Sequence, residues 1–169
     1  ICPRCETTLS QGEVAEGYRD VKDLSATVKF KVKNPEKHGL PENTYLLAWT
    51  TTPWTLPGNV ALAVGTDIAY HLIKEGDDYV IVAAARQGEV LRAGKNPQVV
   101  VIDGEVKGSD LVGIEYEPLF DHYANDAKLK NRENGWKVYA ADFVTTDTGT
   151  GIVHIAPAFG ADDMALGKK

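Results

Sequence analysis

The chain has 169 residues, with 18 Lys and Arg against 24 Asp and Glu, which gives a formal net charge of −6. This length fits one domain, and a hydrophobic content of 43% is enough for a sizeable core. No apolar run approaches the roughly 20 residues of a membrane-spanning helix. The acidic balance argues against a free-standing nucleic-acid binder with a broad basic face, but a local contact with a nucleic acid held mainly by another domain stays open.

The N-terminus carries the only two cysteines, Cys2 and Cys5, and begins at Ile1. We therefore expect a fragment of a longer cytoplasmic chain without a disulfide framework, although a processed terminus would look the same. The Cys-Pro-Arg-Cys spacing is that of half a zinc site, whereas structural zinc usually takes four ligands. Two interpretations stay open: unused thiols near a chain end, or a half-site whose other ligands lie outside the fragment.

From Ala26 onward the hydrophobic pattern favours strands. Residues 26–33 alternate between apolar and polar side chains, which is typical of a strand with one buried face. We therefore divide the chain into a linker with the half zinc knuckle, residues 1–25, and one folded domain, residues 26–169. Further strands are predicted at 44–51, 60–64, 68–74, 79–82, 136–144 and 152–155, with a hairpin turn at Asp103-Gly104 between strands 98–102 and 105–106.

Helices are predicted in only two places. Residues 83–92 contain good helix formers, and a short helix near the C-terminus has Asp162 or Asp163 as its cap. Because strands outnumber helices and do not alternate with long ones, a doubly wound parallel sheet is not favoured. The prediction is a mainly β fold with some α (α+β), an antiparallel β-barrel with short peripheral helices, since closure would remove exposed strand edges.

The histidines and hydroxyl residues form no recognisable nucleophilic triad. His154 stands out because it lies in a predicted strand, in the segment Gly-Thr-Gly-Ile-Val-His-Ile-Ala-Pro at 149–157, and an acidic pair follows it. A strand histidine is more often a core residue than a catalytic one. The Gly-rich residues 148–151 lack the lysine and the helix of a phosphate loop, so a turn between strands is favoured.

Residues 49–59, Trp-Thr-Thr-Thr-Pro-Trp-Thr-Leu-Pro-Gly-Asn, form the most unusual segment. Three consecutive threonines leave a strand and meet two prolines, so their hydroxyl and N–H groups need partners outside a β-ladder. A proline-stiffened corner with a packed tryptophan would account for this pattern. A small pocket with an aromatic wall and several polar donors would account for it as well.

Residues 49–59 and 149–163 together closely resemble the editing domain of isoleucyl-tRNA synthetase, the connective-polypeptide insertion of that class I enzyme. The resemblance covers nearly the whole chain, including the cysteine knuckle. Valyl and leucyl relatives look like Thr-Thr-Arg-Pro at the first motif. Here Thr52 takes the arginine position and Trp54 follows the proline, which is isoleucyl-like.

The resemblance implies hydrolytic proofreading. One methylene distinguishes isoleucine from valine by only about 10–200-fold, so a second site removes the smaller product, and this enzyme is the standard example of the argument. The implied substrate is the 3′ end of tRNA(Ile) charged with valine, and also valyl-adenylate, attacked by a positioned water without a covalent step. The implied partners are this tRNA and the rest of the synthetase. No cofactor is expected for the domain, which is expected to be monomeric and away from membranes, while zinc fits the parent enzyme.

The resemblance also implies roles for individual residues. Asp163 is expected to anchor the substrate ammonium while Asp162 caps the helix. Thr50, Thr51 and Thr52 are expected to bond the ester, the ribose or the attacking water. The residues expected to form the side-chain pocket are Trp54, Thr55, Asn59, His154, Ala156 and Phe159.

Whether His154 acts as a base or only shapes the pocket stays open, and shaping is favoured because no orienting partner is visible. A second interpretation of the chain is a module that binds the aminoacyl group with little activity outside the full enzyme. A third is a structural barrel with a zinc knuckle that contacts RNA, against which the charge of −6 counts.

Overall fold

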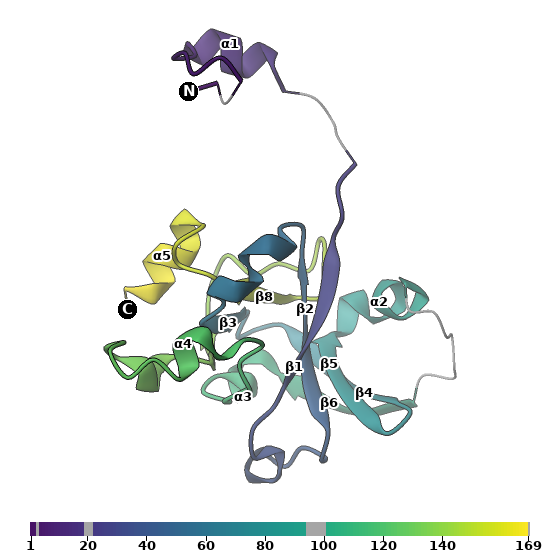
Figure 1. Cartoon of the computed structure of the whole chain (residues 1–169). Helices are drawn as coiled ribbons and strands as arrows, with labels where there is room; N and C mark the ends of the chain where they lie inside the picture. Colours follow the sequence, from purple (N-terminus) through teal and green to yellow (C-terminus); the bar gives the residue numbers. More distant parts are fainter. Residues whose placement is uncertain (3, 19–21, 94–100, 169) are drawn as a thin grey trace.

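The structure is a computed structural model of the chain and describes residues 1–2, 4–18, 22–93 and 101–168. In Figure 1 the N-terminal segment, which contains the short helix α1 (Gln11–Glu16), lies apart from the sheets. A capping box starts this helix: the N–H of Glu13 donates to Ser10 Oγ, and the N–H of Ser10 donates to the Glu13 carboxylate at 2.8 Å. Cys2 and Cys5 are free thiols in this segment.

Among the described residues, the larger sheet has five strands in the order β1-β2-β5-β4-β6. Its neighbours are antiparallel except β2 and β5, which run parallel. The strands are β1 (Ala26–Lys31), β2 (Thr44–Thr50), β4 (Ala69–Glu75), β5 (Asp78–Ala83) and β6 (Val101–Lys107). Most of the predicted strand positions in this part of the chain are therefore confirmed.

The smaller sheet has three strands in the order β7-β3-β8. The central strand β3 (Ala61–Val64) is buried along its whole length, runs parallel to β7 (Lys137–Ala140) and antiparallel to β8 (Ile152–Ile155). The prediction of a mainly β fold with short helices is confirmed. A closed barrel is not found in the described residues, which form two separate sheets with two parallel pairs, so the barrel stays a prediction.

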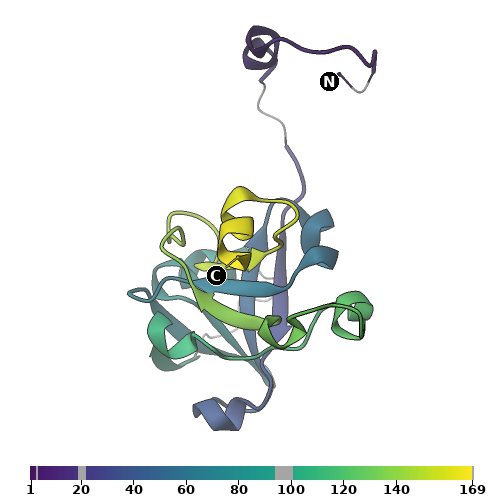
Figure 2. The ribbon, with the colours of Figure 1, turned by 90° about the vertical axis from the view of Figure 1, so that its left-hand side faces the viewer.

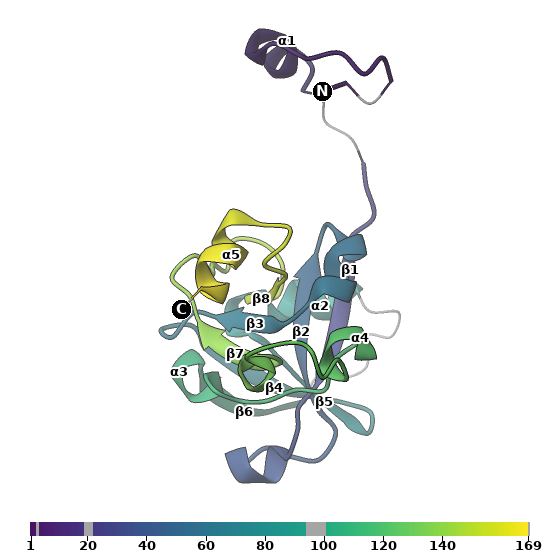
Figure 3. The ribbon, with the colours of Figure 1, turned by 60° about the vertical axis from the view of Figure 1, so that its left-hand side comes forward.

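The helices in the described part of the chain are all short, and α2 and α5 cover outer faces of the sheets. The three layers of core follow from this arrangement: one cluster between the two sheets, one under α2 (Gln87–Ala93) on the larger sheet, and one under α5 (Ala161–Gly167) on the smaller sheet. Figures 2 and 3 show α5 lying over β8 and β3. The other helices are α3 (Gly108–Leu111), α4 (Asp121–Ala124) and the 3-10 turns η1 (Pro35–His38), η2 (Pro53–Gly58), η3 (Ala84–Arg86) and η4 (Arg132–Asn134).

Alternation along β2 explains why this strand is buried on both faces. Leu46 and Ala48 point into the core between the sheets, whereas Leu47 packs in the cluster under α2. The predicted helix 83–92 is confirmed as η3 followed by α2. Within the described residues, no helix has both the length and the apolar character that crossing a membrane requires.

The hairpin predicted at Asp103-Gly104 is wrong, because β6 runs straight through these two residues. Leu72 faces Gly104 and Ile73 faces Ile102, so Asp103 is one extra residue in the ladder between β4 and β6. The turn-forming dipeptide is accommodated as a β-bulge instead of a reversal. Residues 98–100 of the predicted hairpin lie outside the described residues.

Asn59 joins the start of β3 to the core. Its amide nitrogen donates to the Ala61 carbonyl at 2.9 Å, and its carbonyl oxygen accepts from the Tyr116 hydroxyl at 2.7 Å. Tyr116 is fully buried and packs edge-on against Phe30, with ring centroids 5.3 Å apart. Burial also raises the pKa of the Tyr116 hydroxyl well above its ordinary value, so the group is a neutral donor.

Tyr116→Phe should destabilise the domain by about 1–3 kcal/mol, because it leaves the buried Asn59 oxygen without a donor. Urea unfolding followed by tryptophan fluorescence measures this change. Tyr139→Phe is the matched control, since the Tyr139 hydroxyl donates to the Asn134 carbonyl in an exposed position. Equal free energies of unfolding for the two variants would show that the hydrogen bond from Tyr116 to Asn59 does not stabilise the fold.

Removal of metal ions by a chelator should leave the fold intact. Within the described residues, no three side chains of His, Cys, Asp or Glu lie together in a way that could hold a metal ion, and structural zinc normally needs four such ligands. We expect the same thermal unfolding midpoint with and without EDTA. Stoichiometric zinc in the purified chain, with unfolding on its removal, would contradict this expectation.

Candidate active site

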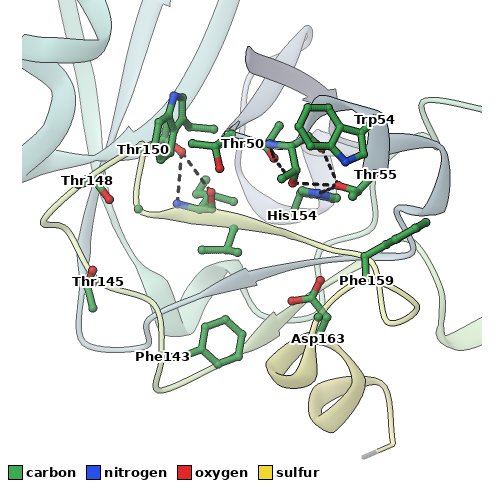
Figure 4. Close-up of a pocket in the computed structure, with 18 residues that line it drawn as sticks. Thr50, Trp54, Thr55, Phe143, Thr145, Thr148, Thr150, His154, Phe159 and Asp163 are labelled. Carbon is green, nitrogen blue, oxygen red and sulfur yellow. Dashed lines mark hydrogen bonds between the residues drawn. The ribbon is translucent and has the colours of Figure 1, made fainter. Parts of the chain in front are cut away.

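A cavity of about 510 Å³ opens where the end of β2, the η2 turn, residues 143–151, β8 and the start of α5 meet. Three consecutive residues of β8, Ile152, Val153 and His154, line it. Consecutive strand residues point to opposite faces, so the cavity follows the edge of β8, which is the edge strand of its sheet. Figure 4 shows Thr50, Thr55 and His154 on one side of this strand and Phe143 and Asp163 on the other.

The threonine segment forms one side of the cavity through local hydrogen bonds. Pro53 begins η2, so the chain turns directly after Thr52. The N–H of Thr52 donates to Thr50 Oγ1 at 3.1 Å, and the hydroxyl of Thr55 donates to the Thr52 carbonyl at 2.8 Å. The side chain of Thr51 is exposed at the cavity.

His154 is the buried part of this side, with 8% of its surface exposed. Its Nε2 lies 2.9 Å from Thr55 Oγ1. Burial lowers the pKa of the imidazole below its ordinary value, although the nearby Asp163 carboxylate acts in the opposite direction. The ring is therefore neutral at pH 7.

Asp163 supplies the negative charge on the other side. Its Oδ2 accepts the N–H of Ala156 at 2.8 Å, which fixes the carboxylate against the end of β8. The prediction that Asp162 caps the helix is wrong: the N-cap of α5 is Gly160, without a side-chain hydrogen bond. Both aspartates instead lie in the first turn, where a negative charge is favourable, and Asp163 lines the cavity.

Exposed aromatic rings flank the opening. Trp54 is 61% exposed and Phe159 is 62% exposed, and both line the cavity. In Figure 4 Trp54 and Phe143 lie on opposite sides of β8, and Phe159 lies beside the end of that strand. Flat rings in such positions suit stacking against a planar group such as a nucleobase.

The structure brings together most of the residues that the sequence predicted for the site. Those that line the cavity are Thr50, Thr51, Thr52, Trp54, Thr55, His154, Phe159 and Asp163. Ala156 and Asn59 do not line it. Ala156 is buried and contributes its N–H to Asp163, and the amide of Asn59 is used inside the fold. Cys2 and Cys5 lie in the N-terminal segment, away from the cavity.

Sequence reasoning missed the wall formed by residues 143–151, which contributes Phe143, Thr145 and Thr148 to the cavity. Gly149 and Gly151 have φ angles of +73° and +74°, which favour glycine. A Cβ atom on Gly151 would lie 2.4 Å from the Cβ of Ala83. The Gly-Thr-Gly pattern was the available signal, since it predicted a turn, but nothing local showed that this turn faces the threonine segment.

Comparisons with known proteins find isoleucine–tRNA ligases as relatives of this chain. The chain is 51% identical over 165 residues to isoleucine–tRNA ligase 2 of Bacillus cereus strain ATCC 14579, covering 98% of this chain and 14% of the relative. It is 44% identical over 187 residues to isoleucine–tRNA ligase of Treponema denticola, covering 99% of this chain and 17% of the relative. The chain thus spans about one seventh of the length of such relatives. No protein-family model matches it.

Solved structures show the same fold at lower identity. The crystal structure of GlLeuRS-CP1 matches with a TM-score of 0.67 and 21% identity over 86% of this chain and 59% of that one. The cytosolic leucyl-tRNA synthetase editing domain of P. falciparum matches with a TM-score of 0.63 and 16% identity over 83% of this chain and 63% of that one. Together with the sequence relatives, this shows that the chain belongs to the isoleucyl-tRNA synthetase family and has the fold of the editing, or connective-polypeptide, domain of class I synthetases.

Proposed function

We propose that this domain hydrolyses the ester bond of valine attached to the 3′ end of tRNA(Ile), and that valyl-adenylate is a second substrate. The observation that carries the proposal is one cavity with a threonine-rich side, a neutral buried histidine and a carboxylate facing the same space. Its volume of about 510 Å³ lies within the range of small-molecule sites. That volume suits an aminoacyl group together with the terminal nucleoside, which Trp54 or Phe159 would stack against.

Asp163 is the anchor for the substrate ammonium. The α-amino group is the fixed positive charge of an aminoacyl ester, and a charge-assisted hydrogen bond to a carboxylate is strong in a partly buried site. The N–H of Ala156 holds one carboxylate oxygen in place at 2.8 Å. A carboxylate accepts several hydrogen bonds, so this contact orients Asp163 and leaves it able to bind an ammonium.

The reaction is a direct attack of water on the ester carbonyl. The water oxygen bonds to the carbonyl carbon, the carbon–oxygen bond to the ribose breaks, and a proton passes to the ribose oxygen, giving free valine and a tRNA with both hydroxyl groups. Threonine hydroxyls and backbone N–H groups near the carbonyl would stabilise the developing oxyanion. Positioning is the main contribution, since an aminoacyl ester is already activated.

The partners of the domain in this proposal are the tRNA and the rest of the synthetase. A net charge of −6 does not favour broad RNA binding by this domain alone, so the rest of the synthetase would hold most of the tRNA. Hydrolysis needs no cofactor in this proposal, and Cys2 and Cys5 would complete a zinc site only with ligands from elsewhere in the parent enzyme. The competing function is a binding module with little activity of its own. Incubation of valyl-tRNA(Ile) with this chain, and separately with a full-length synthetase that contains it, distinguishes a hydrolase from a binding module. Release of valine by both proteins supports a self-sufficient hydrolase, whereas release by the full-length enzyme alone supports the binding module.

His154→Ala should let the full-length enzyme hydrolyse its correct product, isoleucyl-tRNA. The smaller side chain makes room for the additional methylene of isoleucine, whose rejection is worth about 10–200-fold. Deacylation of isoleucyl-tRNA and valyl-tRNA measures the change. His38→Ala is the control, because His38 is exposed in η1 and does not line this cavity. If the His154→Ala enzyme hydrolyses isoleucyl-tRNA no faster than the wild type, the side chain of His154 does not exclude isoleucine.

Asp163→Asn should lower valyl-tRNA hydrolysis by about 100-fold or more, because the substrate loses its orienting charge. The asparagine oxygen still accepts the Ala156 N–H, so thermal unfolding should change little. Asp162→Asn is the matched control, as Asp162 is an exposed neighbour in the same helical turn. Full hydrolysis by Asp163→Asn would show that the carboxylate serves only the Ala156 contact.

A further inference from the structure

The hydroxyl group of Thr55 has no capacity left for a substrate. A threonine hydroxyl has one proton to donate and two lone pairs. The proton goes to the Thr52 carbonyl, which can only accept, at 2.8 Å. The lone pairs face His154 Nε2 at 2.9 Å and Thr52 Oγ1 at 3.3 Å. Thr55 therefore lines the cavity with a side chain whose polar atom is fully used inside the protein.

These contacts determine which nitrogen of His154 carries the proton. Because Thr55 donates its only hydroxyl proton to the Thr52 carbonyl, the contact with His154 needs the proton on Nε2. Nδ1 then has a bare lone pair, and it is buried without a hydrogen-bond partner among the described residues. The opposite tautomer would bury an unpaired N–H at Nδ1, and orphaned buried N–H groups are rarer than orphaned acceptors.

The same contacts decide how His154 faces a ligand. Nε2 is bonded to Thr55, and Nδ1 has less than 1 Å² exposed. Neither nitrogen is presented to the cavity, although the residue lines it. The imidazole therefore contributes its ring as a wall, and the orientation of that wall depends on the Thr55 hydroxyl.

We propose that Thr55 is a positioning residue: its hydroxyl, anchored on the Thr52 carbonyl, holds His154 in the Nε2–H tautomer and in the ring orientation that sets the size limit of the cavity. The selectivity part rests on the proposed function. Thr55 thus excludes isoleucine through the placement of His154 and only secondarily through its own bulk.

Two substitutions at Thr55 separate a positioning role from a steric one. Thr55→Val keeps the shape and removes the hydroxyl, whereas Thr55→Ser keeps the hydroxyl and removes a methyl group. In the full-length enzyme, Thr55→Val should raise hydrolysis of isoleucyl-tRNA about tenfold or more, within the discrimination that one methylene provides. Thr55→Ser should hydrolyse isoleucyl-tRNA about as slowly as the wild-type enzyme does. The reverse order, with the serine variant permissive and the valine variant selective, would overturn the positioning role and leave the hydrolytic function intact.

Histidine nitrogen NMR of the 169-residue chain tests the tautomer without any substrate. The His154 signals are assigned by their loss in His154→Ala. We expect a protonated Nε2 and a bare Nδ1 in the wild type and in Thr55→Ser, and a changed pattern in Thr55→Val. Thr51→Val is the spectral control, because the exposed Thr51 side chain lies outside this chain of contacts. A wild-type spectrum with the proton on Nδ1 would overturn the proposal even if both threonine variants edited as expected.

Discussion

The hydrogen bond between Thr55 and His154 joins two segments that are 99 residues apart in the sequence. Thr55 follows β2 of the larger sheet, and His154 lies in β8 of the smaller sheet, so this contact ties the sheets together at the cavity. It also uses a buried polar group on each side, and each would be destabilising if left unpaired. The site is built around this contact, because the Thr55–His154 hydrogen bond and the pairing of β3 with β8 together place the threonine side of the cavity against β8.

The two sides of the cavity differ in charge for structural reasons. The side with His154 is buried and neutral, since burial disfavours the imidazolium. Asp163 comes from the first turn of α5, where a carboxylate is compatible with the helix end, and it is held by the Ala156 N–H just after β8. One short strand therefore separates a neutral wall of hydrogen-bonded side chains from the Asp163 carboxylate. Such a division suits a ligand with a branched apolar group next to an ammonium.

Glycines allow the third wall to approach closely. Gly149 packs against the Trp49 ring, and Gly151 sits against Ala83 at the end of β5, each with a positive φ. The Thr150 carbonyl accepts the N–H of Ala83 at 2.8 Å, and Arg86 Nε donates to the Gly149 carbonyl at 3.1 Å. The wall is thus held from the larger sheet as well, which makes the cavity a product of both sheets.

The sequence by itself determined the local elements and the family. Alternation of side chains marked the first strand, because a half-buried strand repeats every two residues, and short runs of strand-forming residues between turn signals marked the others. The threonine and histidine segments together identified the editing-domain resemblance. Most of the candidate site followed from that resemblance, since Thr50, Thr52, Thr55, His154 and Asp163 do meet at one cavity.

Only the tertiary structure decided which polar groups face the cavity and which are used inside the fold. Asn59 is bound by Tyr116, a partner 57 residues away, and no local pattern encodes that pairing. Asp103-Gly104 has the composition of a hairpin turn, but pairing along the whole of β4 favours a bulge in a continuous strand. In these two cases local propensity is weak compared with the long-range hydrogen bonds and packing that a folded chain must satisfy. Asp162 differs from them, because α5 begins at Ala161 with Gly160 as its N-cap, which places Asp162 inside the first turn.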